Sequence, residues 1–364
     1  MANIFQSPFK YVQGEGLLRD LYKYIEHFGD RGLVIASNSA LEQWENHLRE
    51  GMTCNKPVIE NFGNRECTEK EINRLISLSN QENINFVIGF GGGKAQDTAK
   101  ALAYKLGCMP LAIIPTIASC DAPTSALSII YTEEGSFQDL WRYHQNPHLV
   151  LVDTEIIANA PSRYLVAGMG DGLATKFEAE ACVKSGNLAG TGGYATELAQ
   201  AAASLCYKII IDYGMTAKQS VISNLVTPAL EKVVEANILL SGLGFENNGV
   251  ASTHGIAHGF SVIHDSKPYL HGEKVAFSTL VQLVLEGQQP KVFTELASFC
   301  RLVGLPITLA ELGITSDKSD KVELLSKAVN FKIASNHPFK VTPHKVYNAV
   351  MLADSMGIDI HNNK

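Results

Sequence analysis

Four histidines gather in the second half of the chain, and their spacing is suited to binding a metal ion. His254 and His258 are four residues apart, so a helix would place both side chains on one face. His264 and His271 follow, which puts four of the chain's 11 histidines between positions 254 and 271. Neutral imidazole is the commonest protein ligand for metals. The cluster therefore predicts a metal site; a set of core histidines is the alternative, and spacing alone does not choose the ligands.

A second group of residues, at 86–94, is suited to binding a phosphate group. An apolar run ends in three glycines at 91–93, and an alanine-rich helix is expected over 95–106. Glycine lets the backbone approach a ligand closely, and the free N–H groups of the helix start then face that ligand. Lys94 stands where the Rossmann fingerprint has its third glycine, and Ala95 follows it where a P-loop needs Ser or Thr. We predict a seat for the pyrophosphate of a dinucleotide, with a tight turn that binds nothing as the alternative.

The first half of the chain alternates apolar runs with helical patterns. Strands are expected at 9–12, 33–36, 57–62, 86–91, 111–114, 127–131 and 149–152, and helices at 17–27, 41–48, 68–79 and 95–106. This order indicates βαβ units and a mostly parallel sheet, whose ligands bind beyond the carboxyl ends of the strands. One such end, at 115–121, is rich in hydroxyl groups and includes Asp121. For Thr116 and Ser119 in this segment, turn and capping roles are the alternative to ligand binding.

After residue 162 the pattern becomes helical. Helices are expected at 170–184, 193–212, 217–241, 248–262, 273–287, 290–303, 320–334 and 343–354. Pro228 should kink or split the third of these helices, and Asp171 should open the first, as a capping residue or as part of a site. The predicted fold is an α/β nucleotide-binding domain with a parallel sheet over 1–162, followed by an all-α domain over 163–364.

Composition and charge exclude several classes of protein. With 364 residues, of which 46% are hydrophobic, the chain can fill the cores of two domains. A net charge of −7 without a basic block argues against nucleic acid as a partner. No apolar run reaches the roughly 18 residues of a membrane span, and residues 1–10 lack the features of a signal peptide. Seven scattered cysteines without a C-x-x-C pair are typical of a reducing cytoplasm.

Longer motifs resemble the glycerol dehydrogenases of the iron-containing alcohol dehydrogenase superfamily, and the likeness covers nearly the whole chain. They include GGGK at 91–94, PTIAS at 115–119, GD at 170–171, VTPALE at 226–231 and HGEKVA at 271–276. The resemblance implies the iron-type alcohol dehydrogenase architecture, shared with dehydroquinate synthase, with the active site in the cleft between the two domains. It also implies a cytoplasmic homo-oligomer, often an octamer.

The resemblance further implies the residues of the site. Zinc would be held by Asp171, His254 and His271, and Asp121 would contact a substrate hydroxyl. NAD would be bound by Gly92, Gly93, Lys94, Thr116, Ser119, Ser125, Leu127 and Tyr131. One carboxylate and two imidazoles leave a coordination position open, as catalytic zinc requires. The implied reaction is NAD-dependent oxidation of glycerol to dihydroxyacetone, or of a related vicinal diol, by hydride transfer with the alcohol oxygen polarised by zinc.

Three positions qualify or depart from the family pattern. Iron-dependent members carry a histidine four residues after the metal aspartate; Thr175 stands there, which favours zinc over iron. Ala257 and His258 replace the His-Asn pair of the glycerol dehydrogenases. We predict that His258 shuttles protons or supports the ligands, with a space-filling histidine as the alternative. Ser37 replaces the usual aspartate that binds the adenosine ribose, so we predict NAD use with weaker discrimination against NADP.

Three other functions compete with this interpretation. A reductase of 2-oxo acids or hydroxycarboxylates from the same superfamily, using NAD or NADP, would change the substrate but not the mechanism. A lyase like dehydroquinate synthase needs several Lys and Arg side chains around a sugar phosphate, and the site segments offer few. A nucleotide-binding protein without activity would not need the set Asp171, His254 and His271.

Overall fold

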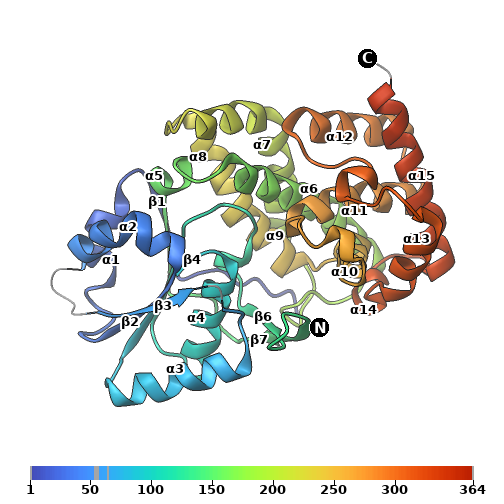
Figure 1. Cartoon of the computed structure of the whole chain (residues 1–364). Coiled ribbons are helices and arrows are strands. Elements are labelled where there is room, and N and C mark those ends of the chain that lie inside the picture. Colours follow the sequence, from blue (N-terminus) through green and yellow to red (C-terminus); the bar gives the residue numbers. More distant parts are fainter. Residues whose placement is uncertain (1, 53–56, 64, 363–364) are drawn as a thin grey trace.

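A six-stranded sheet organises the first half of the computed structural model, which describes residues 2–52, 57–63 and 65–362 and so leaves out Cys54. Its strand order is β1-β8-β5-β4-β2-β3. Figure 1 shows this half, in blue to blue-green, beside the helices of the second half, mostly in yellow to red. The strands are β1 (Lys10–Gly14), β2 (Gly32–Ser37), β3 (Val58–Gly63), β4 (Phe86–Gly91), β5 (Leu111–Pro115) and β8 (Leu149–Asp153). Every neighbouring pair is parallel. The predicted parallel sheet is confirmed.

The sheet is covered on both faces, which explains the continuous apolar runs of its strands. Val87 of β4 belongs to one hydrophobic cluster, whereas Phe86 and Ile88 belong to another on the opposite face. The helices of this half are α1 (Tyr22–Ile25), α2 (Asn38–Gly51), α3 (Glu69–Gln81) and α4 (Gly93–Lys105). Thr68 caps α3, because its hydroxyl accepts from the N–H of Glu71 at 3.2 Å.

A two-stranded antiparallel hairpin stands apart from the sheet. It pairs β6 (Leu127–Tyr131), which was predicted, with β7 (Phe137–Arg142), which was not. The side chains of β7 are exposed or only partly buried, so its residues show no apolar alternation that the sequence could reveal. The hairpin reaches the helical half of the molecule, where Phe137 packs against His258 with ring centroids 5.0 Å apart.

From residue 154 onward, every described element is helical. The helices are α5 (Thr154–Ala158), α6 (Ser162–Ser185), α7 (Glu197–Ile222), α8 (Pro228–Glu235), a π-helical turn (Ala236–Leu240), α9 (Ser241–Asn248), α10 (Ser252–Gly259), α11 (His271–Leu285), α12 (Pro290–Val303), α13 (Lys318–Ala328), α14 (Phe331–Ala334) and α15 (Pro343–Asn362). The α/β and all-α halves match the predicted fold class, and the domain boundary at 162 stays a prediction. No helix in the described ranges is long and apolar enough to cross a membrane.

Two predicted helix boundaries were wrong. Asp171 does not open a helix, because α6 already begins at Ser162 and Asp171 lies in its middle. The break expected between residues 212 and 217 is absent, because α7 runs without interruption from Glu197 to Ile222. The split predicted at Pro228 is confirmed, since Pro228 occupies the first turn of a new helix, α8. Proline is favoured there because the N–H groups of the first turn have no partner within the helix.

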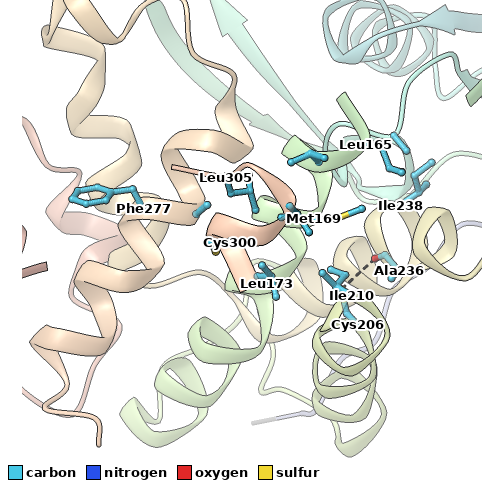
Figure 2. Packing of buried hydrophobic residues seen from close by; sticks show 14 of the residues in the cluster. Leu165, Met169, Leu173, Cys206, Ile210, Ala236, Ile238, Phe277, Cys300 and Leu305 are labelled. Atoms are coloured by element: carbon cyan, nitrogen blue, oxygen red, sulfur yellow. Dashed lines mark hydrogen bonds between the residues drawn. The ribbon is translucent and has the colours of Figure 1, made fainter. Parts of the chain in front are cut away.

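Helix α6 is the centre of the helical core. Figure 2 shows Leu165, Met169 and Leu173 of α6 between Cys206 and Ile210 of α7 on one side and Phe277 and Cys300 of α11 and α12 on the other. The α6 side chains in this group are at most 2% exposed. A functional side chain on α6 is therefore held by packing on several sides.

Candidate active site

The predicted metal ligands come together from three helices. Asp171 lies on α6, His254 on α10, and His271 is the first residue of α11. Asp171 Oδ1 is 3.4 Å from His254 Nε2 and 3.3 Å from His271 Nε2. One ligand atom from each residue lies within 4.8 Å of the other two. His258 and His264 are not part of this group, so the structure selects two of the four clustered histidines.

The glycines around Asp171 allow this approach. A Cβ on Gly170 would lie 2.3 Å from the carbonyl oxygen of Gly272, next to His271 at the start of α11. A Cβ on Gly168 would lie 2.0 Å from the carbonyl oxygen of Ala118, in the segment after β5. Larger residues would push both segments away, so the glycine-rich middle of α6 fixes the distances among the ligands.

The residues fit a bound cation. The Asp171 side chain is 1% exposed, and neither of its oxygens accepts a hydrogen bond of ordinary geometry from the described residues. A buried carboxylate without partners is costly, and a metal ion would compensate it. Burial alone would raise the pKa of Asp171, but His271 and His254 outweigh burial and hold that pKa below its usual range. One carboxylate and two imidazoles suit zinc and similar transition metals.

His254 has a further carboxylate partner that the sequence did not reveal. Its Nδ1 lies 2.5 Å from Glu178 Oε2, and Glu178 is a fully buried residue of α6. Burial acts to lower the pKa of His254, but the carboxylates of Glu178 and Asp171 raise it well above the ordinary value. The one feature of the sequence that could have pointed to Glu178 is its spacing from Asp171. The two residues are seven apart and so share a helix face.

Asp121 lies near the triad and is held by hydroxyl groups. Ser241 donates to Asp121 Oδ2 at 2.7 Å, and the Ser241 hydroxyl also bonds the hydroxyl of Thr175 at 2.8 Å. Burial, followed by the negative charge of Asp171, raises the pKa of Asp121 to about 8. Thr175 is one turn after Asp171 on α6. Thr175, which stands where iron-dependent members have a histidine, therefore supports Asp121 through Ser241.

The glycine turn at 91–93 lies at the point in the sheet where successive strands of the chain change the direction in which they are added. Strands β2 and β4 are neighbours although β3 separates them in sequence, and ligands of open α/β sheets bind at such switch points. Ser37 ends β2 and Gly91 ends β4; a Cβ on Gly91 would lie 2.7 Å from the Ser37 hydroxyl oxygen. Gly93 begins α4. A Cβ at this position would have a single neighbour within 4 Å, Cys120 Sγ at 3.9 Å. This open helix start is the expected place for a pyrophosphate.

The other predicted cofactor residues lie at the start of α4, after β5, and on or next to β6, which is tied to α4 by a hydrogen bond from the Ser128 hydroxyl to the Asp97 carbonyl at 2.8 Å. Gly92 is the N-cap of α4, Thr116 and Ser119 follow β5, Ser125 precedes β6, and Leu127 and Tyr131 are the first and last residues of β6. The Ser125 hydroxyl is buried and donates to the carbonyl of Ala122 at 3.1 Å. Lys94 extends to the surface and pairs with Glu66.

His258 lies on α10, one turn after His254, and occupies an unusual environment. Both ring nitrogens are buried and have no hydrogen-bond partner among the described residues, and the ring stands edge-on to Phe137 of the hairpin. His264 is exposed in a short 3-10 turn. A second group that sequence reasoning missed is Asn237, in the π-helical turn. Its amide donates to the carbonyls of Ala118 and Leu165, which ties the segment after β5 to α6.

Comparison with known proteins decides the family. Residues 8–154 match the family described as iron-containing alcohol dehydrogenase. The chain is 44% identical over 361 residues to a glycerol dehydrogenase of Escherichia coli, with 98% of each chain covered. The chain belongs to the iron-containing alcohol dehydrogenase family. This confirms the resemblance inferred from the motifs, and it makes the protein an oxidoreductase of the alcohol dehydrogenase type.

Two further members of the family are closely similar along their whole length. A glycolaldehyde reductase of Halobacterium salinarum is 41% identical to this family member, with 98% of each chain covered. The crystal structure of a probable glycerol dehydrogenase from Sinorhizobium meliloti has a TM-score of 0.93 at 38% identity, and the match covers 99% of this chain and 100% of that chain. The fold of the iron-type alcohol dehydrogenases therefore extends over both halves of the molecule.

Proposed function

We propose that this protein oxidises glycerol to dihydroxyacetone, or a related vicinal diol to the matching ketone, with NAD as cofactor and zinc as resident metal. The observation that carries the proposal is the triad of Asp171, His254 and His271, built around the buried carboxylate of Asp171, with Asp121 beside it. The relative from Escherichia coli named glycerol dehydrogenase supports the choice of substrate.

The donor set supports zinc over iron. The side chain of Thr175, where a fourth ligand would stand in iron-dependent members, is buried and bonded to Ser241. Three protein ligands would therefore hold the metal and leave one position for the substrate, as in catalytic zinc sites. Zinc bound there would act as a Lewis acid that lowers the pKa of the substrate hydroxyl.

Asp121 is proposed to recognise the diol. With Oδ2 held by Ser241, Oδ1 is left to accept a hydrogen bond from a second substrate hydroxyl. This contact would orient the carbon that loses hydride, and a monoalcohol would lack it. Above a pH of about 8, where Asp121 is ionised, its charge also disfavours the alternative 2-oxo acid substrates, whose carboxylate would face it.

The nucleotide is proposed to bind at the switch point. The backbone N–H groups at the start of α4, beyond Gly92 and Gly93, would take the pyrophosphate, and the adenosine ribose would reach Ser37 at the end of β2. NAD supplies the hydride acceptor. Ser37 has no negative charge to repel a 2′-phosphate, so we propose measurable use of NADP as well.

We also propose a cytoplasmic homo-oligomer with a domain boundary near residue 162. An apolar groove between the N-terminal segment and α7, lined in part by Phe5, Leu198 and Leu205, supports the oligomer. Leu198 is 61% exposed in the single chain. A second copy would remove such apolar surface from water.

A substrate panel tests the proposed function. The zinc-loaded protein would be assayed for kcat/KM with glycerol, propane-1,2-diol and propan-1-ol in the oxidative direction, and with glycolaldehyde and a 2-oxo acid in the reductive direction. We expect the diols to exceed the monoalcohol and the 2-oxo acid to be poor. A clear preference for the 2-oxo acid would replace the proposal with the reductase alternative. Preference for glycolaldehyde would keep the site chemistry and reverse the favoured direction.

A further inference from the structure

Glu178 is a buried carboxylate that touches a metal ligand without belonging to the triad. It lies on α6 seven residues after Asp171, so both carboxylates lie on the same side of the helix two turns apart. Its side chain is 1% exposed. A buried carboxylate is retained only where hydrogen bonds or charges compensate it. Within the described ranges, all the hydrogen bonds that Glu178 accepts come from one short segment.

That segment is the start of α10. Glu178 Oε1 accepts from the backbone N–H of Ala251 at 2.8 Å and from that of His254 at 2.9 Å. Ala251, the N-cap residue of α10, has no side chain to cap the helix, so Glu178 supplies the cap from another helix. The backbone of His254 is thereby fixed relative to α6, which also carries Asp171.

The third contact controls the imidazole ring. Glu178 Oε2 is 2.5 Å from His254 Nδ1. A carboxylate only accepts hydrogen bonds, so Nδ1 keeps its proton, and Nε2 is the nitrogen whose lone pair a metal ion can bind. Nε2 is the nitrogen that faces Asp171 Oδ1, at 3.4 Å. A ring without this partner could take the other tautomer, whose Nε2 cannot bind a metal.

We propose that Glu178 is a positioning residue that presets both the place and the tautomer of His254 for the metal ion. The inference rests on the proposed function insofar as Asp171, His254 and His271 hold the metal. Outer carboxylates of this kind raise ligand basicity, and their removal costs about 10- to 100-fold in metal affinity. Glu178 acts through His254 and does not contact the substrate.

The variant Glu178→Gln isolates the tautomer from the helix cap. The glutamine keeps the volume, and its Oε1 still accepts from the two backbone N–H groups. Its amide nitrogen then donates toward His254 Nδ1, which forces the proton to Nε2. We expect a folded protein whose zinc affinity is reduced about 10- to 100-fold. A second variant, Glu178→Asp, keeps a carboxylate and should bind zinc more tightly than Glu178→Gln does.

A matched control is available in Glu246. This residue is also a buried helical glutamate that accepts a backbone N–H, that of Ala126 at 2.7 Å, and its hydrogen-bond partners in the described chain, Ala126 and Asn146, lie outside the triad. The control Glu246→Gln should bind zinc like the wild type. Circular dichroism and thermal unfolding of all four proteins would establish that each is folded before affinities are compared.

The experiment measures zinc affinity by competition with a chromophoric chelator, using chelator-stripped protein of the full chain. Wild-type affinity in Glu178→Gln would overturn the proposal, and so would an equal loss in Glu246→Gln. Equal affinities in Glu178→Gln and Glu178→Asp would overturn tautomer control. If Glu178→Gln does not fold, Glu178→Ala replaces it: a zinc affinity at least about tenfold below that of Glu178→Asp supports the proposal, and a smaller difference contradicts it.

The same measurement separates this inference from the proposed function. A wild type that binds zinc but does not oxidise glycerol would refute the substrate and leave the role of Glu178 standing. A wild type that binds no zinc would refute the metal site and the role of Glu178 together.

Discussion

Removing the Ser241 hydroxyl tests how Asp121 is held in the active site. Ser241 is fully buried, and it donates to Asp121 Oδ2 at 2.7 Å while bonding Thr175 Oγ1 at 2.8 Å. The change Ser241→Ala deletes both bonds and little volume. A hydrogen bond to a charged group contributes about 1.5–3 kcal/mol. If that energy orients Asp121 toward a diol, kcat/KM should fall about 10- to 150-fold.

The pH dependence should move in a defined direction. Burial and the charge of Asp171 raise the pKa of Asp121 to about 8, whereas the bond from Ser241 lowers it. Loss of that bond favours the protonated acid, so the rise of kcat/KM with pH should shift to higher pH in Ser241→Ala. The fold-change above is therefore measured above this range, where the carboxylate is ionised in both proteins.

Steady-state assays with glycerol and propan-1-ol would measure the effect, with Ser278→Ala as the matched control. Ser278 is also fully buried, but its hydroxyl has no partner among the described residues. A double-mutant cycle with Asp121→Asn identifies the route, because Ser241→Ala should cost little once the carboxylate is gone. Additive losses in the cycle, or an equal loss with propan-1-ol, would refute the role assigned to Asp121.

Three other predictions concern the choice of cofactor, the role of His258 as a proton shuttle and the pH dependence of stability. Ser37→Asp places a negative charge where a 2′-phosphate would lie, so the NADP/NAD ratio of kcat/KM should fall at least about tenfold; an unchanged ratio would place the ribose elsewhere. His258→Ala should alter the pH–rate profile, since both ring nitrogens are free of protein partners in the described chain; an unchanged profile would leave His258 a packing residue against Phe137. Burial lowers the pKa of His337, whose Nε2 lies 2.8 Å from the Ser252 hydroxyl. The unfolded chain then binds more protons, so the melting temperature should fall as pH drops through about 6.5, and less steeply in His337→Gln; parallel curves would contradict this.

The parallel sheet was predictable because its four central strands are buried on both faces. The apolar runs of β2, β4, β5 and β8 need no partner to be recognised, and glycine turns and caps such as Thr68 mark their connections. The hairpin strand β7 lacks that signature. It is exposed over much of its length, so its pairing with β6 decides its conformation.

The interior of α6 shows why helix starts were harder to predict. Gly168, Gly170 and Gly172 have low helix propensity, and they made Asp171 look like the beginning of a helix. Tertiary packing reverses that preference, because Ala118 and Gly272 approach α6 only where a Cβ is absent. The same glycines that obscured the helix are those that bring its carboxylate to the histidines.

The candidate site was predictable in its ligands but not in its supports. The histidine cluster indicated a metal, and the family motifs chose Asp171, His254 and His271, which the fold brings together. Glu178 and Ser241 lie on other helices than the groups they hold. Their roles depend on how those helices pack, and no local spacing in the sequence encodes that.

The central claim is that Asp171, His254 and His271 hold a zinc ion that this protein needs to oxidise glycerol with NAD. The most direct test is NAD reduction with glycerol at alkaline pH, for the protein as purified, after chelation, and after zinc is restored. We predict that chelation abolishes the rate, that zinc returns it, and that Asp171→Asn shows no return. Full activity after verified metal removal, or zinc-restorable activity in Asp171→Asn, would contradict the account.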